Sequence, residues 1–269
     1  MINKFKVVVI IAFVTVQTMV VFGQDGGTPG LLYVSINNNT EFTVRAGTAT
    51  SGAIVIPATH NNRPVTSISN NAFKDLTGIT SVTIGSNVAR IEDNAFLGCT
   101  NLARLTIPNS VTSIGVSAFE GTGLTTVTIG NNVDAVGFRA FFGCKNLTTV
   151  TIGNNVTAIG LSTFADCRDL NRVTIGNKVS SIGANVFENC LSLTTITLPG
   201  NVTSIGANAF SGCTNLINVT IQGTISSSNF SRSAFPGDLR AKYFISDERA
   251  GGRGTYTRPD GSSRVWAKK

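Results

Sequence analysis

One motif returns at a nearly constant interval through most of this 269-residue chain. Its phenylalanine recurs at steps of 23, 23, 22, 23, 23 and 23 residues. These residues are Phe73, Phe96, Phe119, Phe141, Phe164, Phe187 and Phe210. A fixed period of roughly 20–50 residues is typical of solenoids, in which each repeat forms one coil that buries its apolar side chains against its neighbours. The period therefore predicts a solenoid over residues 53–230, with about seven full repeats and a degenerate one, and assigns the phenylalanines a structural role.

Each repeat contains a short strand with alternating apolar and polar residues. In Val150-Thr151-Ile152 the valine and the isoleucine point inward and the threonine points outward, because successive side chains of a strand lie on opposite faces. Val156 and Ile159 then indicate a second short extended segment, and the Ser-Ala-Phe segment after it is interpreted as a single helical turn. The Leu-x-x-Leu-x-Ile core and the period are typical of leucine-rich repeats. The fold class is thus a β-rich α/β solenoid, right-handed, with a parallel β-sheet, short second strands and single helical turns.

Two residues after each repeated phenylalanine stands a glycine, an asparagine or an aspartate. These residue types tolerate a positive φ better than the others. We therefore expect a left-handed residue in every coil, which reverses the chain toward the next strand. The positions are Asp75, Gly98, Gly121, Gly143, Asp166, Asn189 and Gly212.

The next position in the repeat holds all five cysteines of the chain. Leu76 replaces cysteine in the first repeat, which favours a buried apolar role for this column. Adjacent coils lie close enough for a disulfide, but parallel side chains rarely reach the required dihedral angle and five cysteines cannot all pair within one chain. We therefore predict free buried thiols and no metal site. The column continues with Cys99, Cys144, Cys167, Cys190 and Cys213.

The N-terminal residues are typical of a secretory signal peptide. Lys4 and Lys6 precede a 16-residue apolar stretch, Val7 to Phe22, which is shorter than the roughly 20 residues that a membrane-spanning helix needs. Gly23 supplies a small residue for cleavage. Residues 1–23 are therefore interpreted as a signal peptide, and alternating apolar residues indicate an N-terminal β cap over residues 24–52.

Positive charge is concentrated at the C-terminus. Residues 24–230 contain ten Lys or Arg and ten Asp or Glu, whereas residues 231–269 contain nine and four. A neutral body argues against nucleic-acid binding, and residues 231–269 are interpreted as a basic C-terminal cap. Arg253, Arg258 and Arg264 of this cap are candidates for binding anionic glycans or a lipid headgroup surface, although a cap whose charges only aid solubility explains them as well.

The outward residues of the first strands form two columns that are candidates for a binding surface. Threonine fills most of both columns, and two arginines stand out among them. Hydroxyl groups and two cations suit docking of an extended protein or glycan, whereas threonine is also an ordinary solvent-facing strand residue. The candidate residues are Arg104, Thr106, Thr126, Thr128, Thr149, Thr151, Arg172, Thr174, Thr195 and Thr197.

Catalytic constellations are missing from the sequence pattern. The single histidine, His60, has no matching acid or nucleophile in the repeat and is predicted to be a surface residue. With one histidine and no acidic column, we expect no enzyme, no cofactor and no metal centre.

The full repeat, Leu-x-x-(Val/Leu)-Thr-Ile-(Pro/Gly)-x-x-Val-x-x-Ile-Gly-x-x-Ala-Phe-x-Gly-Cys, resembles the BspA-type leucine-rich repeat. The resemblance covers about residues 53–222. It implies an exported or surface protein that binds host proteins such as fibronectin, or that mediates adhesion and coaggregation, but it names no ligand because solenoid faces diversify freely.

Two functions follow as expectations. The first is a secreted or surface protein that binds extracellular-matrix or other cell-surface proteins, or anionic glycans, through its sheet face, with membrane contact only during export. The second is a structural envelope protein that assembles with itself and has no host ligand. The sequence leaves the oligomeric state and a periplasmic location open.

Overall fold

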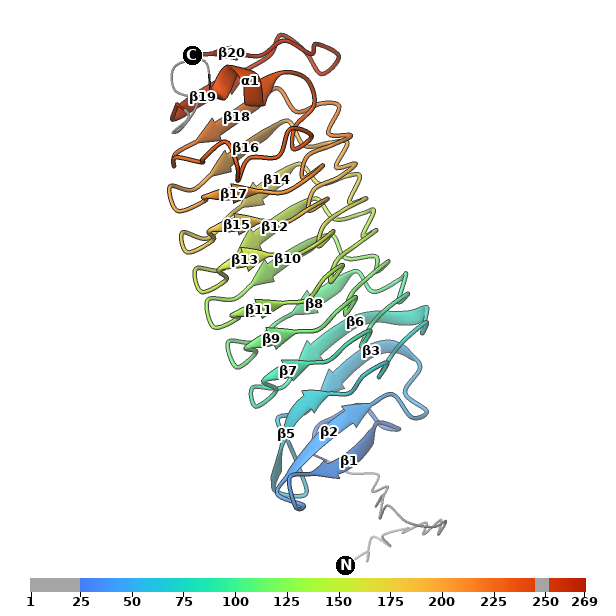
Figure 1. The fold of residues 1–269 in the computed structure, drawn as a ribbon. Helices are drawn as coiled ribbons and strands as arrows, with labels where there is room; N and C mark the ends of the chain where they lie inside the picture. The colour runs from blue at the N-terminus through green and yellow to red at the C-terminus, as the bar shows by residue number, and fades with distance from the viewer. Residues whose placement is uncertain (1–24, 245–251) are drawn as a thin grey trace, which may run out of the picture.

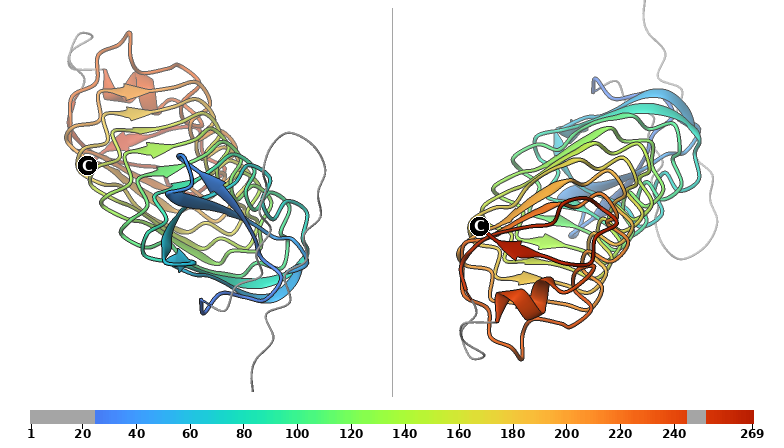
Figure 2. Two further views of the ribbon diagram at one scale, coloured as in Figure 1. Left: turned by 90° about the horizontal axis from the view of Figure 1, so that it is seen from below. Right: turned by 90° about the horizontal axis from the view of Figure 1, so that it is seen from above.

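The chain winds into a long stack of coils, seen from the side in Figure 1. The computed structural model describes residues 25–244 and 252–269. The predicted signal peptide, residues 1–23, lies outside the described residues. The two end views in Figure 2 show the coils one behind another, with the N-terminal strands at one end and the C-terminal helix at the other. The predicted solenoid is therefore confirmed.

A first sheet is made of one strand from each coil, and these strands run parallel. Its hydrogen-bonded ladder is interrupted between β8 and β10 and between β14 and β16. At the first interruption the repeat is one residue shorter than the others, between Phe119 and Leu124. The strands are β3 (Ser51–Ile56), β6 (Gly78–Ile84), β8 (Arg104–Thr106), β10 (Thr126–Ile129), β12 (Thr149–Ile152), β14 (Arg172–Thr174), β16 (Thr195–Leu198) and β18 (Asn218–Ile221).

A second sheet is made of the shorter strands that follow in each coil, as the sequence predicts. These strands are also parallel to one another, and their ladder is interrupted between β11 and β13. They are β5 (Arg63–Ile68), β7 (Arg90–Ile91), β9 (Ser113–Ile114), β11 (Ala135–Val136), β13 (Ala158–Ile159), β15 (Ser181–Ile182) and β17 (Ser204–Ile205).

The third side of each coil carries the repeated phenylalanine and is a turn instead of the predicted helical turn. All seven predicted left-handed positions after the phenylalanines have positive φ. A second left-handed residue, which the sequence analysis missed, lies two positions before each phenylalanine. Two left-handed residues so close together exclude a right-handed helical turn, and they direct backbone N–H groups along the stack: the Phe141 amide donates to the Thr163 carbonyl at 3.0 Å. The missed positions are Asn71, Asn94, Ser117, Arg139, Ser162, Asn185 and Asn208.

The phenylalanines form the centre of one continuous core. Each is fully buried, and each ring stacks on the ring of the next coil. The Phe119 and Phe141 ring centroids, for example, are 5.3 Å apart with an interplanar angle of 8°. Since each ring lies between two others, the burial of one coil depends on both neighbours.

Glycine after the first strand allows the coils to approach closely. A Cβ atom at Gly176 would lie 2.3 Å from the Gly153 carbonyl oxygen, and one at Gly153 would lie 2.3 Å from the Gly130 oxygen. No side chain fits at that separation, so the stack requires glycine at these positions unless the turn changes.

Antiparallel strands cover both ends of the stack. At the N-terminal end β1 (Leu32–Ile36) pairs with β2 (Glu41–Arg45), and β2 lies parallel to β5. The short β4 (Thr59–His60) pairs with the start of β5. At the C-terminal end β19 (Gly254–Thr257) pairs antiparallel with β18, and β20 (Ala267–Lys268) pairs with β19. Reversing the strand direction stops further stacking of coils and covers the last apolar layer.

The described residues contain one helix, α1 (Leu239–Tyr243), which belongs to the C-terminal cap. It has five residues, and a bilayer span takes about 20. No helix within residues 25–244 and 252–269 could therefore cross a membrane.

Replacing a ring inside the stack should strongly destabilise the fold. Phe141→Ala removes a fully buried ring and leaves a cavity between two others, so the free energy of unfolding should fall by roughly 3–5 kcal/mol. Val265→Ala is the control, because that side chain is 61% exposed, and it should cost less than about 1 kcal/mol. Chemical denaturation measures both, and equal losses would contradict the stacking model.

Candidate binding surface

The predicted Thr and Arg columns lie side by side on the outer face of the first sheet. The parallel register aligns Thr126 with Thr149 and Thr149 with Arg172 in one column. It aligns Thr128 with Thr151 in the other. Of the ten candidate residues, eight are exposed and two, Thr149 and Thr151, are half-buried. The structure therefore brings all ten together on one face, as one chemically uniform surface.

Both arginines border interruptions of the ladder. Arg104 is in β8, the last strand before the first interruption, and Arg172 is in β14, the last strand before the second. The apolar neighbours Leu105 and Val173 are only partly buried at these points. Each cation thus stands beside an interruption of the ladder. The shorter repeat between Phe119 and Leu124 marks the first interruption in the sequence, whereas the repeat length does not change at the second.

The two cations are separated by a regular span of hydroxyl groups. Arg104 and Arg172 are three strand spacings apart, about 15 Å at roughly 4.8 Å per strand. Among the described residues neither arginine is in an ion pair. Their charges are therefore available to an acidic ligand that lies across β8 to β14.

The candidate face ends differently at its two sides. At the N-terminal side β3 places Val55, which is 38% exposed, beside Thr83. At the C-terminal side Thr220 contacts Thr255 of β19 through their hydroxyls at 3.0 Å. The polar array is therefore confined to the middle coils and is followed by the cap.

Arg258 of the basic tail is a structural residue rather than a surface cation. It is buried and donates hydrogen bonds to the carbonyls of Leu216, Cys213, Thr214 and Ser263. Its guanidinium also lies 5.1 Å from the Trp266 ring centre, and burial lowers its pKa. The prediction that Arg258 binds a ligand is corrected accordingly, because its donors already bond carbonyls of the last coil.

The other two arginines of that set remain at the surface. Arg253 and Arg264 are both exposed on the C-terminal cap. Their binding to anionic glycans stays a prediction.

His60 is buried, contrary to the prediction of a surface residue. Its ring stacks on Tyr33 with centroids 3.9 Å apart and meets the edge of Phe42. The Asp25 carboxylate lies 3.1 Å from Nδ1 and also accepts the Asn61 amide at 2.7 Å. His60 therefore links Asp25 to Tyr33 and Phe42 of the N-terminal cap. The sequence offered no signal for this, because Asp25 and Tyr33 lie outside the repeat.

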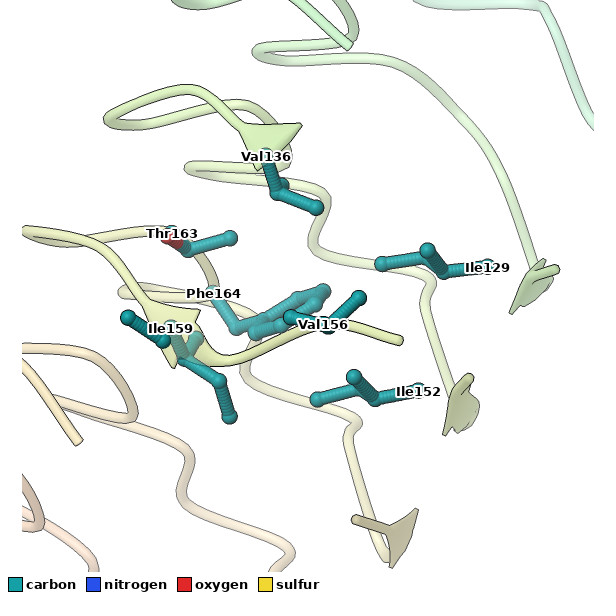
Figure 3. A pocket seen from close by; sticks show the side chains of 8 residues that line it. Ile129, Val136, Ile152, Val156, Ile159, Thr163 and Phe164 are labelled. Atoms are coloured by element: carbon teal, nitrogen blue, oxygen red, sulfur yellow. The ribbon is translucent and has the colours of Figure 1, made fainter. Parts of the chain in front are cut away.

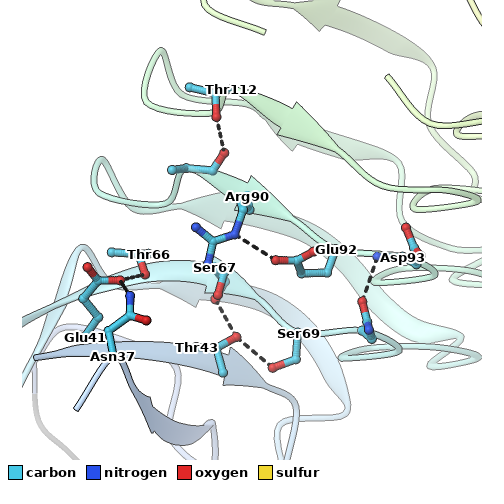
Figure 4. A network of polar contacts seen from close by, with 12 residues as sticks. Asn37, Glu41, Thr43, Thr66, Ser67, Ser69, Arg90, Glu92, Asp93 and Thr112 are labelled. Carbon is cyan, nitrogen blue, oxygen red and sulfur yellow. Dashed lines mark hydrogen bonds and ion pairs between the residues drawn. The ribbon is translucent and has the colours of Figure 1, made fainter. Parts of the chain in front are cut away.

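A network of polar contacts crosses the outer side of the second sheet near this cap (Figure 4). Glu41 accepts hydrogen bonds from Asn37 and Thr66, each at 2.8 Å. Arg90 pairs with Glu92 at 3.0 Å. These contacts tie β2 to β5 and to the coil that follows.

The five cysteines form a buried thiol ladder, as predicted. All are free and buried. Each sulfur donates to the carbonyl oxygen of a phenylalanine in the preceding coil, as Cys99 does to Phe73 at 2.9 Å and Cys213 to Phe187 at 3.0 Å. Burial raises the pKa of Cys99 and Cys213 to about 12, and it also raises the pKa of Cys167 and Cys190. At Cys144 the effect of burial is outweighed by hydrogen bonds from Cys167 and Thr122, which lower the pKa. Four of the five thiols are therefore poor nucleophiles and metal ligands, because the thiolate is the reactive form, and Cys144 is protected by its complete burial.

The interior provides no ligand cavity at the interruption of the second sheet. The space there lies between apolar side chains, including Ile129, Val136, Ile159 and Phe164 (Figure 3). It has no room for a water molecule. No group of three or more His, Cys, Asp or Glu within residues 25–244 and 252–269 could hold a metal ion.

The thiol ladder should be inert in the folded protein. At pH 8 a thiol-specific disulfide reagent should modify no cysteine within minutes, and all five after denaturation. Thr197→Cys, on the exposed face, serves as the positive control and should react at once. Rapid reaction of any native cysteine would show that the ladder opens.

Acid should weaken the N-terminal cap through His60. Burial lowers its pKa, so between about pH 7.5 and 5.5 the unfolded chain takes up a proton that the folded chain does not, and stability falls as the pH falls. Denaturant unfolding over this pH range measures the loss. His60 is the only histidine, so His60→Phe, which keeps the stacking on Tyr33, should be flat over this window. An equal slope in that variant would contradict the assignment.

Comparisons with known proteins agree with this architecture. The family model of the BspA type leucine rich repeat region matches six copies, over residues 66–191 and 135–238. No curated protein is similar enough to the chain to count as a match.

Two solved structures share the fold. The leucine-rich repeat protein TpLRR of T. pallidum is 25% identical with a TM-score of 0.51, over 62% of this chain and 90% of that one. A leucine-rich repeat protein of Bacteroides ovatus is 20% identical with a TM-score of 0.55, over 78% and 63%. Because the family model covers more than half of the sequence, the chain belongs to the BspA-type leucine-rich repeat family.

Proposed function

We propose that this protein is an exported, non-enzymatic binding protein. In this proposal it attaches to extracellular-matrix or other cell-surface proteins of a host or a neighbouring cell. One observation carries the proposal: the first sheet presents an exposed array of threonines with two unpaired arginines among the described residues.

The chemistry of this face favours an extended acidic protein segment. Arg104 and Arg172 would bind carboxylates about 15 Å apart, and the threonines between them would donate and accept hydrogen bonds with the backbone of the ligand. A flat hydroxyl surface without an aromatic residue gives few strong contacts, so one protein should bind weakly and gain strength from several contacts at once.

The side chains with catalytic potential in the described residues also favour a binding role. Among the described residues the histidine and the cysteines are buried, and the acidic side chains form no cluster that could hold a metal. The signal-peptide pattern of residues 1–23 supports export. A position at the cell surface or in the medium is part of this proposal.

Reversing the two cations should abolish binding. Arg104→Glu/Arg172→Glu should lose at least about tenfold in affinity for immobilised fibronectin or other matrix proteins, because two charge contacts become repulsive. The matched control, Arg45→Glu/Lys74→Glu, changes the net charge equally at exposed positions away from the first sheet. Surface plasmon resonance at two salt concentrations measures both. Equal binding by the two variants, or none by the native protein, would refute the sheet face as the site.

A further inference from the structure

A row of residues, all exposed except the half-buried Ala184, runs along the stack beside the second sheet. Its members stand directly before the left-handed position that precedes each phenylalanine. Asn70 holds this place in the first coil, and we call the part from the second coil onward the outer row. Backbone hydrogen bonds join its neighbours, as from the Ser117 amide to the Phe138 carbonyl at 2.9 Å. In the last coil the Phe210 amide donates to the Ala234 carbonyl, as the Phe187 amide does to Ala209 one coil earlier. Ala234 is thus equivalent to Ala209, and Arg232 is equivalent to Ala207 of the row. The outer row is Asp93, Val116, Phe138, Leu161, Ala184, Ala207 and Arg232.

The middle of the outer row exposes large apolar side chains. Val116, Phe138 and Leu161 are 40%, 56% and 44% exposed, on three consecutive coils. They are half of the six large apolar residues exposed in the described part of the chain. Single exposed apolar residues are ordinary, but a contiguous group marks a surface that another molecule covers.

The same three coils have the least favourable left-handed residues. Asn71, Asn94, Asn185 and Asn208 occupy this position elsewhere, and asparagine tolerates positive φ. Beside the apolar group it is replaced by Ser117, Arg139 and Ser162, at φ of 52°, 57° and 53°. Less favourable backbone conformations concentrate at functional surfaces, so a second, independent feature coincides with the exposed apolar side chains.

The second sheet is interrupted at the centre of the row. Its ladder stops between β11 and β13, and Figure 3 shows Val136 and Ile159 on the two sides of this gap. The Phe138 ring lies against the end of β13, since a Cβ atom at Gly160 would lie 2.9 Å from it. A partner at this place would therefore cover the interruption between β11 and β13.

The order of residues in the outer row makes it complementary to itself. The row begins with an acid, continues with large apolar residues, then with alanines, and ends with a base. If a second copy is turned end for end about an axis at Leu161, Phe138 faces Ala184 and Val116 faces Ala207. Asp93 then faces Arg232, so large side chains meet small ones and each acid meets a base.

We propose that two copies of this protein dock antiparallel through the outer row, about a two-fold axis at Leu161. An isologous contact of this kind needs one self-complementary surface. Among the described residues Asp93 and Arg232 are in no ion pair, and both are exposed. Arg139, which follows Phe138 in the chain, already pairs with Glu120 at 2.6 Å. Its charge is therefore neutralised within one copy and does not repel the other.

The row is long enough for a stable contact. Six coil steps of about 5 Å make it about 30 Å long, and a width of about 25 Å would give the roughly 800 Å² per partner of a standard interface. From β9 to β17 the neighbouring second sheet presents small side chains, including Ala135, Ala158, Ser181 and Ser204, whereas β7 presents Arg90, which pairs with Glu92. The small side chains let a second copy approach over that width. A parallel arrangement is disfavoured, because it would place Asp93 against Asp93 and Phe138 against Phe138.

Sedimentation equilibrium of the purified protein tests the proposal. The native protein should show twice the mass of one chain and dissociate on dilution. Phe138→Asp buries a charge in the contact and should raise the dimer dissociation constant at least tenfold. Leu191→Asp, at a residue 36% exposed outside the row, is the matched control and should leave the constant unchanged. Circular dichroism verifies that both variants are folded.

A charge exchange distinguishes the antiparallel contact from any other. Asp93→Arg alone and Arg232→Asp alone each place like charges opposite one another and should weaken the dimer. The double variant restores opposite charges and should recover most of the native affinity.

A native protein that stays monomeric at high concentration would overturn the proposal, and so would a double variant that is as weak as the single ones. Because these variants leave Arg104 and Arg172 intact, failure here is separate from failure of the proposed matrix binding.

Discussion

The structure depends on contacts between equivalent residues of adjacent coils. A single coil has an apolar side but no core, and its Phe ring, thiol and inward valines are buried only when the next coil places the same groups against them. Phe141 lies between Phe119 and Phe164 at 5.3 and 5.4 Å, and its own coil contributes neither ring. This dependence explains the nearly constant repeat length, and the one shorter repeat keeps the phenylalanine column but coincides with an interruption of the first sheet. It also explains why both ends need antiparallel strands.

The same stacking decides how the protein can interact. Each outward position recurs along the stack at about 5 Å, so side chains form long columns and not pockets. The threonine face and the outer row are two such columns on different sides of the coil. A partner must therefore be extended, or must itself have a regular spacing. A second copy of the chain meets this condition without further assumptions, because its row has the same period.

Sequence reasoning succeeded where the repeat supplied several aligned copies of one position. Seven left-handed residues, the buried cysteines and the Thr columns were predicted because each position could be compared across coils. It failed where a residue belongs to no column. His60 and Arg258 were expected at the surface, yet Tyr33 and Asp25 enclose the first and the carbonyls of the last coil enclose the second. The predicted helical turn was wrong because a second left-handed residue, held by serine and arginine in the middle coils, carries no clear compositional signal.

By itself the sequence determined the solenoid, its period, the buried columns and the residues that face outward on the first strands, since periodicity and strand alternation are local properties. Only the tertiary structure decided where the sheet ladders are interrupted, which charges remain free and which exposed apolar residues become neighbours. Val116, Phe138 and Leu161 are more than 20 residues apart from one another in sequence, and the stacking of coils alone makes them one surface. The physical reason is that hydrogen-bond register and burial between coils depend on how the coils stack, whereas periodicity and strand alternation depend only on residues close together in sequence.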